Sequence, residues 1–107
     1  DTPYVPRSRS REVTFQENLT DPAELAEQMR LLARHVAQDV LDEGRPAARI
    51  GVKIRYAPFI TKTRSLTLPA PTTDAEEIER AALEVLSSLD QDQPVRLLGV
   101  RAEFTDE

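Results

Sequence analysis

The chain has 107 residues, enough for one domain, because a single hydrophobic core usually spans about 100 to 150 residues. Its composition, 39% hydrophobic and 31% charged with neither Cys nor Trp, supports a modest core and excludes disulfides and thiolate metal sites. No apolar run approaches the roughly 20 residues of a membrane span, and no secretory signal pattern opens the chain. We therefore expect a cytoplasmic protein without a membrane partner.

The first part of the chain predicts a linker, a strand and a helix. Residues 1–8, with two prolines and the start of an Arg-Ser alternation, favour an extended interdomain linker, and residues 9–107 then form one domain. Alternation over 11–15 predicts a strand. Asp21 and Pro22 predict a helix start and Gly44 predicts its end. The apolar stripe of this helix is Leu25, Met29, Leu32, Val36 and Val40.

The second part predicts two paired strands, a helix and a last strand. From Arg49 to Tyr56, apolar residues alternate with cations and one glycine, so this strand has one buried and one cationic face. A turn at Ala57–Pro58 leads to a partner strand over 59–68, with a bulge expected near Arg64 and with Pro69 and Pro71 ending it.

A capping box of Thr73 and Glu76 predicts the start of the second helix, and residues 95–104 predict the last strand. The buried stripe of this helix is Ile78, Ala82, Val85, Leu86 and Leu89. The order is β-α-β-β-α-β, which indicates an α+β fold: a four-stranded antiparallel sheet with two helices on one face, the ferredoxin-like arrangement.

Charge is segregated by predicted element. The strand windows 7–14, 45–68 and 94–101 carry a net charge of about +10, and the helix windows 21–43 and 74–90 carry about −9. The overall charge of −5 argues by itself against a nucleic-acid partner. If both helices cover one face of the sheet, however, the other face is basic and suits a polyanion.

Catalytic constellations are largely missing. His35 is the single histidine and falls on the polar side of the first helix, there is no thiol nucleophile, and no phosphate-binding glycine loop is present. We expect no catalytic residue, no metal site and no cofactor in this domain.

The strands instead carry hydroxyls and cations, which are the side chains that contact phosphates and sugars. They include Ser8, Arg9, Ser10, Arg11, Thr61, Lys62, Thr63, Arg64 and Ser65. Aromatic residues for base stacking are lacking among them, because Tyr56 and Phe59 fall on the core parity. This pattern argues against a reader of single strands.

Four segments together resemble the little finger, or polymerase-associated domain, of Y-family translesion DNA polymerases of the bacterial DNA polymerase IV type. They are SRSREVTF at 8–15, ARIGVKIRY at 48–56, FITKTRSLTL at 59–68 and VRLLGVR at 95–101. The resemblance covers nearly the whole chain and rests on the order and spacing of these segments.

The resemblance implies a non-catalytic domain that grips double-stranded primer-template DNA with its sheet during translesion synthesis. It implies a fragment of a DNA-directed DNA polymerase whose catalytic palm, with its Mg²⁺, is absent here, and it places the protein at the bacterial nucleoid. The partners would be DNA, the palm and thumb of the same enzyme, and the sliding clamp. The positions that match DNA contacts are Ser8, Arg9, Ser10, Lys53, Arg55, Thr61 to Ser65 and Arg96, with Arg11 beside them; Leu97 departs from members with a second basic residue there.

Two other classes of function remain open from the residues alone. A ferredoxin-like domain can be a small-molecule regulatory domain, which needs a largely apolar pocket with a few polar groups. It can also be a protein-interaction module, in which the acidic helices bind a basic partner.

Overall fold

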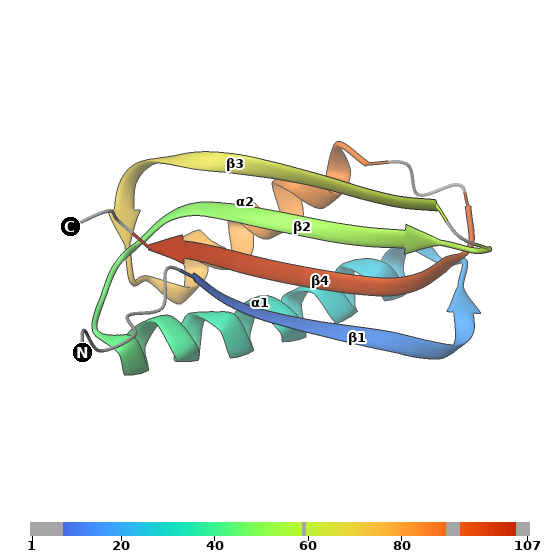
Figure 1. Ribbon diagram of the computed structural model, residues 1–107, viewed down its shortest axis with the longest axis horizontal. Helices are drawn as coiled ribbons and strands as arrows, with labels where there is room; N and C mark the ends of the chain where they lie inside the picture. Colours follow the sequence, from blue (N-terminus) through green and yellow to red (C-terminus); the bar gives the residue numbers. More distant parts are fainter. Residues whose placement is uncertain (1–7, 59, 90–92, 105–107) are drawn as a thin grey trace, which may run out of the picture.

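The computed structural model describes residues 8–58, 60–89 and 93–104 of the protein. The elements are β1 (Ser8–Leu19), α1 (Pro22–Glu43), β2 (Ala47–Tyr56), β3 (Ile60–Thr72), α2 (Ala75–Ser87) and β4 (Val95–Phe104). The strands form one antiparallel sheet in the order β1-β4-β2-β3, and both helices lie behind the same face (Figure 1). The predicted α+β fold, a four-stranded antiparallel sheet with two helices on one face, is thus confirmed.

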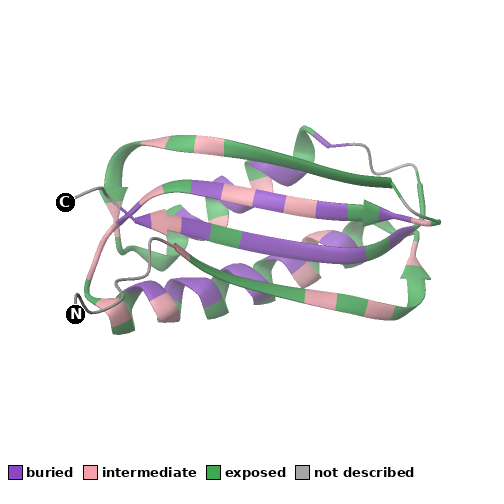
Figure 2. Cartoon of the chain, in the orientation of Figure 1, coloured by how far each residue is buried: buried purple, intermediate pink, exposed green. Residues whose placement is uncertain are grey.

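The core lies between the helices and the two central strands, β2 and β4, which carry most of the buried strand residues (Figure 2). α1 packs against β1 and β4, and α2 packs against β2 and β3. Every residue of the two predicted apolar stripes is buried, including Leu89 just beyond α2. The helical spacing of these residues puts them on the side of each helix that faces the sheet.

The ends of α1 follow from its capping residues. Asp21 is the N-cap, and its carboxylate accepts a hydrogen bond of 3.0 Å from the amide of Ala23, while Pro22 occupies the first turn. Gly44 ends the helix with a φ of 69°, a left-handed conformation that glycine adopts without a Cβ penalty. Neither helix of the described part is both long and apolar enough to cross a membrane.

The cap of α2 lies one residue later than predicted. Asp74, not Thr73, is the N-cap, and its carboxylate accepts from the amide of Glu76 at 3.3 Å. Thr72 supports this start, since its hydroxyl accepts from the Asp74 amide at 3.0 Å. An ionised carboxylate at this position also interacts favourably with the positive end of the helix dipole.

The prediction for the third strand was wrong at two points. Pro69 and Pro71 do not end β3, which runs on to Thr72. β3 is an edge strand, where a proline costs no ladder hydrogen bond if its nitrogen faces away from the neighbour. The pairing with β2 is regular from Ile60 to Thr67, so no bulge occurs at Arg64; the register shifts only between Thr67 and Thr72.

The first strand is longer than predicted. β1 begins at Ser8, the last residue of the expected linker, and ends at Leu19. Its pairing with β4 is regular from Ser8 to Thr14 and then irregular up to Leu19. The rest of the expected linker, residues 1–7, lies outside the described ranges.

Candidate nucleic-acid interface

The sheet face opposite the helices, called the open face below, is lined by every second residue of each strand. On β2 these residues are Arg49, Gly51, Lys53 and Arg55, which alternate with Ile50, Val52, Ile54 and Tyr56 of the core. Residues directly opposite on neighbouring strands share a face. The register therefore adds these residues to the open face: Ser8, Ser10, Glu12 and Thr14 of β1; Thr61, Thr63, Ser65 and Thr67 of β3; and Leu97, Gly99, Arg101 and Glu103 of β4.

Hydroxyls of β3 orient two guanidinium groups of β2 across this face. Arg49 donates from Nε to the Ser65 hydroxyl at 3.0 Å, and Arg55 donates from Nε to the Thr61 hydroxyl at 3.0 Å. Each bond uses one of the five N–H donors of a guanidinium, so the remaining donors can serve an anion.

Arg96 joins this face through an irregularity in β4. The pairing between β2 and β4 shifts between Arg55 and Tyr56, since Arg55 pairs with Leu97 but Tyr56 pairs with Val95. The extra residue is Arg96, which with Arg55 lines a hollow beside the turn at Ala57 and Pro58. A bulge re-aims a side chain in this way.

A trough of about 450 Å³ runs across the middle of the open face. Its floor contains Gly51 of β2 and Gly99 of β4, which have no side chains to fill it. Arg49, Lys53 and Arg101 are among the cations that line it, together with the hydroxyls of Ser10, Thr63 and Ser65. A groove with cations and hydroxyls on its sides has the chemistry of a sugar-phosphate contact.

The open face is cationic although the protein is acidic. Among the described residues it carries five cations (Arg49, Lys53, Arg55, Arg96 and Arg101) and two carboxylates (Glu12 and Glu103). The aromatic residues of the described part all pack into or against the core: Phe15, Tyr56 and Phe104. The face is therefore suited to phosphates more than to stacked bases.

Comparison with known proteins identifies the family. Residues 6–105 match the impB/mucB/samB family C-terminal domain. The chain belongs to this family. It is 43% identical over 101 residues to DNA polymerase IV 2 of Mycobacterium tuberculosis, covering 94% of this chain and 29% of that protein. It is also 43% identical over 100 residues to DNA polymerase IV of Methanoculleus marisnigri, covering 94% of this chain and 28% of that protein.

Two solved structures share the fold. One is a complex of the beta-clamp processivity factor and the little finger domain of PolIV, with a TM-score of 0.75 and 19% identity, covering 94% of this chain and 90% of that one. The other is an insertion ternary complex of Dbh DNA polymerase, with a TM-score of 0.69 and 17% identity, covering 91% of this chain and 28% of that one. The chain is thus a little finger domain of the DNA polymerase IV type and spans under a third of its polymerase relatives.

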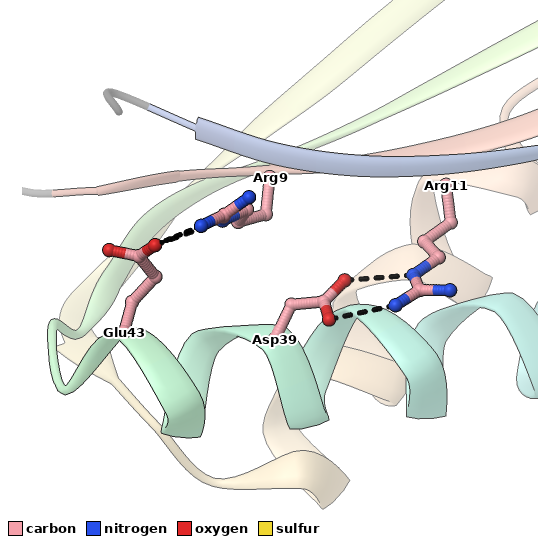
Figure 3. Close-up of polar contacts among 4 residues, drawn as sticks. All are labelled: Arg9, Arg11, Asp39 and Glu43. Atoms are coloured by element: carbon pink, nitrogen blue, oxygen red, sulfur yellow. Dashed lines mark hydrogen bonds and ion pairs between the residues drawn. The ribbon is translucent and has the colours of Figure 1, made fainter. Parts of the chain in front are cut away.

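Arg9 and Arg11 do not lie on the open face of this little finger domain, although the sequence analysis grouped them with its other contacts. They share the parity of Val13, which packs against the core, and so they face α1. Arg9 pairs with Glu43, and Arg11 forms two hydrogen bonds of 2.9 Å to the carboxylate of Asp39 (Figure 3). These pairs join the edge strand to the helix.

The distance between Arg9 and Arg11 along β1 matches the distance between Glu43 and Asp39 along α1. Residues two apart on a strand are roughly 6.8 Å apart, close to the rise of about 6 Å between residues four apart on a helix. Hydrogen bonds from Arg11 hold the pKa of Asp39 below its ordinary value, against an opposing effect of partial burial, and the same pair raises the pKa of Arg11.

This pair supports a prediction about stability and pH. Replacing Asp39 by Asn should lower the free energy of unfolding by less than about 1 kcal/mol, because the Arg11 side chain is 50% exposed to screening solvent. Since the folded pKa of Asp39 is lowered, the difference should be complete above its unfolded pKa and should vanish as the pH falls through the folded pKa. Urea unfolding of both proteins at a series of pH values from 7 downward measures this; a loss that does not shrink as the pH falls would contradict it.

Lys62 and Arg64 alternate along β3 with Thr61, Thr63 and Ser65, and so they point to the opposite side of the sheet. They pair with Ile54 and Val52, so they project toward the helix side at the exposed edge of the sheet. The five residues Thr61 to Ser65, which the sequence analysis treated as one contact segment, are therefore divided between the two sides. Ser8, Ser10, Lys53 and Arg55 lie on the open face.

Four residues of the open face are not among the site residues predicted from the sequence: Arg49, Arg101, Gly51 and Gly99. Arg49 and Arg101 are basic residues within the predicted strands. Arg49 has the same strand parity as Lys53, and Arg101 has the same parity as Gly99, so strand alternation indicates that both face the open side. The two glycines gave no signal, because only the register of β2 against β4 brings them together on the floor of the trough.

Other chemistry is sparse. In the parts of the chain that the structure describes, no group of three or more His, Asp and Glu side chains could hold a metal ion. His35 is exposed on α1, as its position in the helical pattern predicts.

Proposed function

We propose that this little finger domain binds the duplex part of primer-template DNA through the open face of its sheet. The observation that carries the proposal is the separation of charge. Five cations and the hydroxyls of β1 and β3 share one face, while exposed acids such as Glu27 and Glu84 lie on the helices behind the sheet. Counterion release from phosphates drives such binding and needs no base contacts.

The parent protein, in this proposal, is a translesion DNA polymerase whose palm supplies the catalytic carboxylates and binds Mg²⁺. The polymerase relatives are longer than this chain, which covers 29% of the protein from M. tuberculosis. In this proposal, the chain before β1 tethers the domain to the thumb. A tether raises the local concentration into the millimolar range, so a weak grip suffices. Such an enzyme works at the nucleoid.

The sliding clamp is the second proposed partner. It is favoured by one observation, the likeness of this fold to a little finger domain in complex with a beta-clamp processivity factor. That likeness supports a clamp contact only through the shared fold. It does not identify which residues of this chain would contact the clamp.

The test is a titration of labelled primer-template duplex with the domain at two salt concentrations. If about four phosphates are neutralised, the affinity should fall roughly 100-fold between 50 and 200 mM salt. Little dependence on DNA sequence is expected, because Asn and Gln that read bases are missing from the described open face. Binding that does not change with salt would refute the proposal, and an unrelated duplex of equal length is the control.

A second prediction separates the open face from the edge of β3. Replacing Lys53 and Arg55 by Ala should weaken DNA binding more than replacing Lys62 and Arg64 by Ala, although both double variants remove two positive charges. Lys53 and Arg55 lie on the open face, beside the trough and the Arg96 hollow. Lys62 and Arg64 have the other parity of β3, although Arg64 also borders the trough, where its carbonyl oxygen lies near Gly51. The same titration measures both, and thermal unfolding should show a change of about 0.5 kcal/mol or less in each. A larger loss from the β3 pair would place the DNA at that edge.

A further inference from the structure

A carboxylate of the protein itself lies in the cationic trough. Glu12 of β1 and Lys53 of β2 are not on adjacent strands, since β4 runs between them. Their strands are therefore roughly 9 to 10 Å apart. Even so, Oε2 of Glu12 lies 3.8 Å from Nζ of Lys53, which makes an ion pair across the intervening strand.

Gly99 makes this ion pair possible. It is the β4 residue that pairs with both Glu12 and Lys53, so any side chain at this position would stand between them. A Cβ built on Gly99 would lie 3.1 Å from Cβ and 3.6 Å from Oε2 of Glu12. The Glu12 side chain thus leans over the glycine and occupies the space that a side chain there would take.

The other half of the trough is not covered in this way. A Cβ built on Gly51 would meet only ordinary contacts, at 3.7 Å from the Arg64 carbonyl oxygen, 3.8 Å from Cβ of Ser65 and 4.0 Å from Cβ of Arg101. Glu103, the second carboxylate of the open face, forms no ion pair with a described residue. The two carboxylates therefore differ in position relative to the cations.

We propose that Glu12 is an internal competitor of the DNA phosphate: its carboxylate holds Lys53 over Gly99 in the free domain, and a backbone phosphate must displace it to bind there. This inference rests on the proposed function and adds to it a residue that limits affinity. Both side chains are partly exposed, 55% for Glu12 and 41% for Lys53, so the pair is weak enough to exchange. The competition lowers the affinity for every duplex alike, because it concerns a phosphate and not a base.

The experiment compares Glu12→Gln with Glu103→Gln in the 107-residue chain. Each removes one negative charge from the open face, so their effects on the general electrostatic field are similar. Glu12→Gln should tighten binding of labelled primer-template duplex by about two- to fivefold at low salt, the range that an exposed ion pair allows. Glu103→Gln should tighten it by less than about twofold.

A double-mutant cycle with Lys53→Gln then tests the coupling. In the Lys53→Gln background, Glu12→Gln should lose its advantage and match Glu103→Gln. Equal gains from the two single variants, or an undiminished gain in the Lys53→Gln background, would overturn the competition while leaving DNA binding intact. Failure of the parent domain and of Glu12→Gln alike to bind duplex at low salt would overturn the proposed function and this inference with it.

Discussion

Replacing Lys53 and Arg55 by Glu should abolish DNA binding at every salt concentration at which the parent domain binds. Both residues lie on the open face, where Lys53 lines the trough and Arg55 lines the Arg96 hollow. Their reversal puts two negative charges against phosphates within the screening length of about 8 to 10 Å, so salt cannot remove the repulsion at close contact. Titration of labelled primer-template duplex measures the effect.

The matched control reverses charge on the helices in the opposite sense, with Glu27→Lys and Glu84→Lys. These residues belong to α1 and α2, behind the sheet. Any gain in affinity should be small and should disappear at moderate salt, because the added cations lie farther than a screening length from the DNA. Control of binding by the helix pair, with no effect from the strand pair, would mean that the open face does not contact DNA.

Replacing Ile54 or Leu98 by Ala should have the largest effect on stability. The two residues pair directly on β2 and β4, and both are fully buried. Each truncation should cost about 2 to 5 kcal/mol through lost apolar contacts and the cavity that remains. For a domain of this size, each kcal/mol lowers the melting temperature by about 4 to 8 °C.

Thermal and urea unfolding measure this loss, and the matched measurement is DNA affinity well below the melting transition. That affinity should stay close to the parent value, because both side chains face the helices and not the open face. The Lys53 and Arg55 variants should show the reverse, with lost binding and little change in unfolding. If the core variants and the Lys53 and Arg55 variants changed stability and DNA affinity to the same extent, the assignment of these residues to opposite faces of the sheet would be wrong. Since Ile54 and Leu98 are neighbours, the loss of unfolding free energy in the double variant should differ from the sum of the two single losses.

Local patterns in the sequence suffice to predict the elements, their order and the two faces of the central strand β2. Alternation in β2 assigned Lys53 and Arg55 to one side and Ile54 to the other, because a strand whose two faces meet core and solvent must alternate. The helical spacing of the two apolar stripes likewise identified the buried sides of α1 and α2. These patterns are local, and burial acts on each of them directly.

Which side chains of the edge strands β1 and β3 face the helices depends on how the whole domain packs. In SRSR of β1 and TKTRS of β3, polar residues occupy both parities, so hydropathy does not say which side meets the helices. The position of Arg9 and Arg11 depends on Glu43 and Asp39, which are about 30 residues away along the chain and become neighbours when α1 packs on the sheet. The continuation of β3 through Pro69 and Pro71 depends on its place at the edge, where a proline nitrogen needs no partner.

The trough on the open face likewise could not be predicted from the sequence. Gly51 and Gly99 come together only through the register of β2 against β4, and Glu12 reaches Lys53 only because a glycine lies between their strands. Register is a property of the whole sheet, set by which apolar residues must face the helices on all four strands at once. The composition of each strand thus determined that the domain carries a cationic face, and the packing of the strands decided which cations form it and which carboxylate lies among them.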